Sequence, residues 1–211
     1  MQVETRTRYA LGAILLFAVT TLVAVSAALS AVSVKSEVKA ALLWIVLLFA
    51  ALSGLARVFV REEEAGTAPL LRLSAPPTAV YAGKWLFNTA LVLAVEAVTV
   101  PLFLIVLPLK TVNFGLLLGV LLLGGLGLSG AATFVAALIA QAGGGKSALF
   151  FIVAFPVLMP LLLIAVQATV GAFDDIASHY DRARGALGLL TVYGVVMTTA
   201  SFLLFEYIWH D

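Results

Sequence analysis

Six long apolar runs occupy most of the chain, and no other feature limits its fold as strongly. They cover residues 9–32, 40–60, 79–108, 112–140, 147–172 and 186–208. A helix needs about 20 mostly apolar residues to cross the hydrocarbon core of a bilayer. The runs meet that length, and they are continuous rather than alternating, as the strands of a membrane barrel would be. The sequence therefore predicts an all-α, polytopic membrane protein with six transmembrane helices.

The composition excludes several other classes of protein. The chain is 63% hydrophobic and 11% charged, and the segments between the runs are too short for a separate soluble domain. We therefore expect residues 1–211 to form a single membrane domain. A net charge of +1 gives no indication of a nucleic-acid partner. The absence of cysteine excludes disulfides, thiolate metal sites and covalent attachment of a c-type haem.

The first apolar run has two interpretations. Basic residues in "RTR" precede it and "VSAALSA" offers small residues, as in a cleaved signal peptide. The run 9–32 is longer than the apolar part of a signal peptide, however, and matches a full membrane span. We therefore favour a retained first helix, with a cleaved leader as the alternative.

Basic residues predict the orientation of the helices. Six spans place both termini on one side, and cytoplasmic loops carry an excess of lysine and arginine. On the side of the termini are Arg6, Arg8, Arg57, Arg61, Arg72, Lys84 and Lys146. On the other side are Lys35, Lys39, Lys110, Arg182 and Arg184. The bias predicts cytoplasmic termini.

A polar insert, "RVFVREEEAGTAPLLRLSAPP" at residues 57–77, separates the second and third runs on the predicted cytoplasmic side. Gly66 is suited to end the second helix, because glycine tolerates the left-handed cap conformation. Thr67 is a candidate N-cap for a short helix in "APLLRLS", which Pro76 and Pro77 would close. Thr78 is then a candidate cap for the third span.

The insert has both acidic and apolar residues, and residues 61–78 are the predicted coupling segment. A two-turn helix with three leucines is too short to cross a membrane, but it can lie on the surface or enter a groove on a partner. The alternative is a solvated turn. The candidate docking residues are Glu62, Glu63, Glu64, Thr67, Leu70, Leu71, Arg72 and Leu73.

The glycines before Lys146 suggest a phosphate-binding loop at first sight. The P-loop pattern requires a glycine five residues before Gly145, where this chain has Ala140. That segment also connects two membrane spans instead of following a buried strand. The chain therefore has no ATPase site, and no zinc-binding or nucleophile motif lies within the runs, so we expect no enzyme.

Glu96 is the functional candidate within the membrane. It lies in "LVLAVEAVTVPLF", near the middle of the third run, where a charge is costly. Such a side chain should be neutral or have a partner, and Thr99, Thr133 and Gln167 carry groups of the right type. Pro101 makes a bend nearby. We expect Glu96 to face the interior and influence conformational change; simple structural pairing is the alternative.

Two further runs contain special residues. The fourth carries glycines at 115, 119, 124, 125, 127 and 130, which allow close helix packing, either within the protein or at a dimer or moving interface. In the fifth, Pro156 and Pro160 predict a helix kink.

His179 lies among loop carboxylates at 173–185; a lone histidine there is usually solvated, and we expect no metal site.

The order of these segments resembles that of the CcmB family, the haem exporter protein B family. The resemblance is carried by "TRTRYALGAILLFA" at the start, "VYAGKWLFN" after the insert and "LFFIVAFPVLMPLLLIAV" in the fifth run. The end of the second run adds an aromatic-basic-acidic turn, Gly-Thr and a leucine-rich short helix. Together these segments cover essentially the whole chain.

The resemblance implies the permease subunit of an ABC-type haem exporter complex in c-type cytochrome maturation, in the bacterial cytoplasmic membrane. It implies a CcmA-type ATPase, CcmC- and CcmD-type membrane partners, and a homodimer as a further option. Haem would be the handled ligand, and ATP would act only through the partner. Exporters of this architecture contact their ATPase through a short helix between spans two and three, which favours docking at the insert. The alternatives are an exporter of another substrate and a scaffold without transport.

Overall fold

The computed structural model is all-helical over the residues it describes. Those residues are 2–29, 34–55, 75–107, 109, 111–140, 146–174 and 176–210. The helices are α1 (Gln2–Leu29), α2 (Ser36–Leu55), α5 (Pro77–Val106), α6 (Phe114–Ala140), α7 (Lys146–Phe173) and α8 (Ala177–His210). The predicted all-α class is confirmed for this part of the chain.

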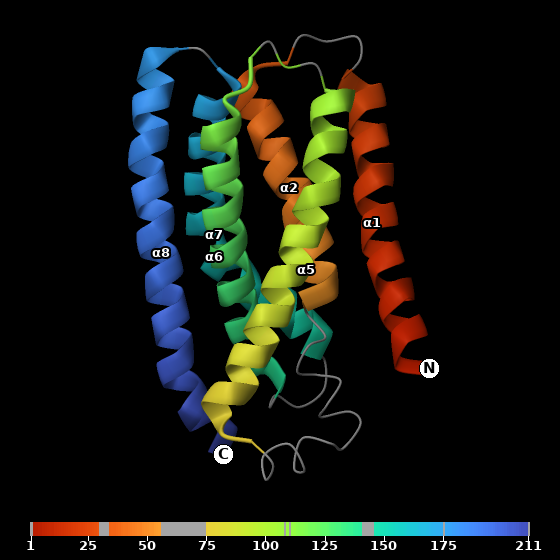
Figure 1. Ribbon diagram of the computed structural model, residues 1–211, viewed down its shortest axis with the longest axis vertical. Coiled ribbons are helices and arrows are strands. Elements are labelled where there is room, and N and C mark those ends of the chain that lie inside the picture. The colour runs from red at the N-terminus through yellow and green to blue at the C-terminus, as the bar shows by residue number, and fades with distance from the viewer. Residues whose placement is uncertain are drawn as a thin grey trace.

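The helices run side by side along one axis, and α1 begins at the same end of the bundle at which α8 ends (Figure 1). Helix α6 is central, because it is the most buried of the five long apolar helices and contacts α2, α5, α7 and α8. Helix α1 packs against α2 and α5 at the edge. A central helix in contact with four others needs small side chains, and α6 carries the glycines noted above.

Helices α2, α5, α6, α7 and α8 are long and apolar enough to cross a membrane. In α1, among the residues whose side chains the structure describes, the apolar stretch is Leu16–Ala28. The structure thus confirms five helices suited to membrane crossing, and the sixth crossing stays a prediction.

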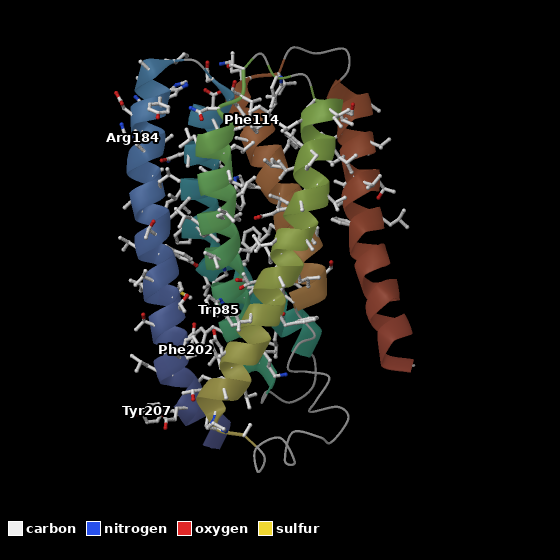
Figure 2. All side chains as sticks on the ribbon, in the orientation of Figure 1. Trp85, Phe114, Arg184, Phe202 and Tyr207 are labelled. Carbon is white, nitrogen blue, oxygen red and sulfur yellow. The ribbon has the colours of Figure 1, made fainter. Side chains whose placement is uncertain are left out.

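Large apolar side chains point outward as well as inward. Ile105 and Ile152 are 78% and 67% exposed. Tyr207 is 75% exposed and lies near the end of the bundle where the chain ends (Figure 2). In a bilayer the first two would contact acyl chains, and a tyrosine at a helix end suits the headgroup level. The exterior therefore fits a multi-pass membrane protein.

Two helix boundaries differ from the sequence-based expectation. The N-cap of α5 is Pro76, with φ −66° and ψ 147°, so Thr78 lies in the first turn and is not the cap. Pro77 occupies the first position of α5, where proline is favourable because the N–H that it lacks would have no helical partner there anyway. Helix α8 begins at Ala177, and not near residue 186. An apolar run marks only the part of a helix suited to the bilayer, and the polar first turns of α8 precede that part.

Helix α7 continues through both of its prolines. The Tyr193 hydroxyl of α8 donates to the Val157 carbonyl of α7 at 2.7 Å. Val157 lies in the turn before Pro160, where the helix loses a backbone hydrogen bond. The α8 hydroxyl thus binds a carbonyl in the turn that the proline weakens.

Candidate functional site

Glu96 is buried between α5 and α6. Only 5% of the residue is exposed. Its carboxyl group lies against the backbone of Gly125: a Cβ atom there would stand 2.8 Å from Oε1 and 3.2 Å from Oε2. Real Cβ atoms do not approach so closely, so the carboxyl occupies the space that any side chain at position 125 would need. This contact explains why α6 has glycine at that position.

The neighbouring glycine accommodates a second large side chain. The Trp44 ring of α2 covers Gly124, and a Cβ atom there would collide with it. The Trp44 indole N–H donates to the Thr169 hydroxyl of α7 at 2.8 Å. That hydroxyl in turn donates to the Ala165 carbonyl. The adjacent glycines of α6 therefore bring α2, α5 and α7 together at one level.

The next glycines along α6 face α7 and α8. A Cβ atom on Gly127 would stand 2.8 Å from Leu161, and one on Gly130 would stand 3.4 Å from the Thr198 hydroxyl oxygen. Of the two interpretations of the glycines, tight packing within the protein describes positions 124, 125, 127 and 130.

Two side-chain hydrogen bonds join α5 directly to α6. The Asn88 amide donates to the Thr133 hydroxyl at 2.7 Å, and the Thr89 and Ser129 hydroxyls are 2.8 Å apart. All four residues are buried. The Thr133 and Ser129 hydroxyls also donate to carbonyls of their own helix. These contacts extend the polar zone from Glu96 toward the start of α5.

Buried polar atoms without partners lie along the same face of α5. In the described part of the chain they are Trp85 Nε1, Asn88 Oδ1, Glu96 Oε1 and Thr99 Oγ1. Residues spaced by 3, 11 and 14 positions fall on one side of a helix with 3.6 residues per turn. We call Trp85, Asn88, Thr89, Glu96 and Thr99 the polar face of α5. Figure 2 shows Trp85 beside Phe202 of α8, and their ring centroids are 6.3 Å apart.

The partners that the sequence offered for Glu96 do not bind it. Thr99 is buried one turn away, but its hydroxyl has no partner. Thr133 pairs with Asn88 instead, and Gln167 is exposed on α7. The rotation and axial position of each helix against its neighbour determine which side chains meet, and residue type alone does not reveal them.

Sequence reasoning missed Asn88 and Thr89. The signal was present, because an asparagine within an apolar run is a candidate on the same grounds as Glu96. It also missed Trp44, whose role depends on contact with α6, and nothing local reveals that contact.

The remaining candidates have different outcomes. All the predicted docking residues lie within 56–74, outside the described residues. The glycines at 143–145 also lie outside the described residues. His179 Nδ1 is 3.3 Å from Asp174 Oδ2 near the start of α8. Among the described residues, no group of three or more metal-binding side chains occurs.

The polar face of α5 holds a single carboxyl group, with amide, indole and hydroxyl groups beside it. This set can exchange hydrogen bonds as helices move.

Comparison with known protein families gives a match over nearly the whole chain. The family model described as "CcmB protein" matches residues 1–204. No curated protein and no solved structure matches the chain.

Proposed function

Because the chain belongs to the CcmB protein family, whose members are ABC-type haem exporter permeases of cytochrome c maturation, we propose that it is the permease subunit of such a complex. The single observation that carries the proposal is the match over residues 1–204. The bundle of apolar helices agrees with it, since a permease must lie in the bilayer.

A CcmA-type ATPase supplies the energy in this proposal, together with CcmC- and CcmD-type membrane partners. The chain itself lacks a P-loop, because Ala140 stands where the pattern needs glycine. ATP therefore acts only through the partner. Haem is the handled ligand, the whole of 1–211 is one permease domain, and the complex lies in the bacterial cytoplasmic membrane.

The insert is the proposed docking element for the ATPase. Helix α2 ends at Leu55 and α5 begins at Pro77, at the end of the bundle where α8 also ends (Figure 1). With cytoplasmic termini, this end of the bundle faces the cytoplasm. The acidic run Glu62–Glu64 would then meet basic residues of the partner.

Glu96 has a different proposed role. It lies at the α5–α6 contact, with its carboxyl group against Gly125 and Oε1 unpaired. We assign it to the conformational equilibrium of the permease and not to haem binding.

The test is recovery of an ATPase with the tagged chain, followed by haem analysis of the purified complex. Reversing Glu62, Glu63 and Glu64 to lysine should lower ATPase recovery and leave membrane insertion intact. Glu206→Lys is the matched control, because Glu206 is exposed near the same end of the bundle but on α8. Equal recovery from the triple variant and the control would reduce the insert to a solvated turn.

A second arm separates transport from scaffolding. In cells that carry a catalytically dead ATPase, the permease proposal expects loss of holocytochrome c. Normal maturation with the dead ATPase would favour a scaffold that holds maturation factors together. A complex that contains no haem, with maturation intact, would favour export of another substrate.

A further inference from the structure

The closed α5–α6 interface leaves polar groups without partners. Asn88 and Thr99 are 0% exposed and Glu96 is 5% exposed, yet each has a buried atom with no hydrogen bond in the described structure. A buried polar atom without a partner costs free energy, and in a bilayer no solvent relieves it. The cost falls on one face of one helix, so a single movement can remove it.

Water is not the missing partner in this conformation. The unpaired atoms are inaccessible to a water molecule, and the Glu96 carboxyl is in contact with the Gly125 backbone. A bridging water needs room beside its polar partners. The groups become hydrated only if α5 and α6 separate.

The contacts that close this interface are easily exchanged. Asn88–Thr133 and Thr89–Ser129 are hydrogen bonds, which water replaces at small net cost. Helix α6 packs more extensively against α7 and α8 than against α5. Pro101 also lies within α5, two residues after Thr99, and leaves the carbonyl of residue 97 without its helical donor. Of α5, α7 and α8, the three helices that pack most against α6, α5 packs least and carries the unpaired polar atoms, so it is the one we expect to move.

We propose that the α5–α6 interface is a gate for water and small hydrophilic solutes, which opens when α5 withdraws from α6 and hydrates the polar face of α5. The opening lies within one copy of the chain, between two of its own helices. The proposed gate does not depend on which cargo the protein handles; only its coupling to ATP rests on the proposed function.

The test uses the absence of cysteine from the natural chain. A charged, membrane-impermeant methanethiosulfonate reagent modifies a thiol only where water reaches it. Thr89→Cys and Thr99→Cys place near-isosteric thiols on the polar face of α5. The measurement is the rate of labelling in native membranes, during ATP turnover and after ATP depletion, for variants that still insert and mature cytochrome c.

Three control variants define the background. Glu37→Cys, at an exposed position in the first turn of α2, should be labelled in every state. Val98→Cys, 37% exposed on the outer side of α5, should face lipid and stay unlabelled. Leu158→Cys, 1% exposed on α7, should stay unlabelled unless the whole bundle loosens.

Labelling of both α5 cysteines should be at least about tenfold faster during turnover, since a minor conformation is typically populated at roughly 0.1–10%. Equal labelling with and without ATP would support the gate and contradict its coupling to an ATPase. No labelling of either α5 cysteine in any state, with Glu37→Cys labelled, would overturn the gate. Labelling of Val98→Cys and Leu158→Cys at the same rate would overturn it too, because the opening would not be at this interface.

Discussion

A single methyl group tests the contact between Glu96 and α6. Gly125→Ala would place Cβ 2.8 Å from Glu96 Oε1, so the buried carboxyl must be displaced, either by a change in the Glu96 side chain or by a shift of α5 away from α6. We expect a loss of about 1–3 kcal/mol in the free energy of unfolding, the usual range for overpacking. Gly119→Ala is the control, because its Cβ would meet Leu187 at an ordinary 3.7 Å. Detergent-titrated unfolding measures both, and equal stabilities would contradict the contact.

The unpaired carboxyl predicts opposite effects on stability and on function. Glu96→Leu removes a buried unpaired oxygen, so the folded protein should be as stable as the natural one or more stable. The same change should lower cytochrome c maturation, because it removes the group that favours an open α5–α6 interface. Glu96→Gln keeps the size and the polarity and should be mild. Normal cytochrome c maturation with Glu96→Leu would show that Glu96 is not needed for function.

At the scale of elements, one hydrogen bond ties α8 to the proline-containing turn of α7. Tyr193→Phe removes the donor to the Val157 carbonyl. Interhelical hydrogen bonds in membranes contribute about 0.6 kcal/mol on average, and we expect a loss of that order. Tyr207→Phe, on the exposed side of the same helix, should change nothing. Thermal unfolding of the two variants in one detergent decides the matter: if Tyr193→Phe is no less stable than Tyr207→Phe, the bond does not brace α7.

At the scale of the whole molecule, the bundle begins and ends at the same end (Figure 1). The basic residues predict that this end is cytoplasmic. A reporter active only in the periplasm should therefore be silent after Asp211. Inserted near Asp174, at the opposite end, it should be active. The reverse pattern would invert the orientation, and with it the side on which the ATPase docks.

The sequence alone determined the class of the fold and the helix whose glycines allow close packing. Long apolar runs require helices in a bilayer, because every backbone polar group must be bonded within its own segment. The glycines of "FGLLLGVLLLGGLGLSGAATF" marked the helix that others approach closely. Glu96 was found because a carboxyl group in an apolar run is costly wherever it faces.

Only the tertiary structure decided which groups meet. Helix–helix register is set by packing, so the sequence did not tell that Thr133 pairs with Asn88 or that Gln167 points outward. It did not reveal that Gly124 and Gly125 accept Trp44 and Glu96 from different helices. Nor did it show that the unpaired buried atoms of the described residues all lie on α5, because a polar residue acquires or lacks a partner only when its helix is set against the next one.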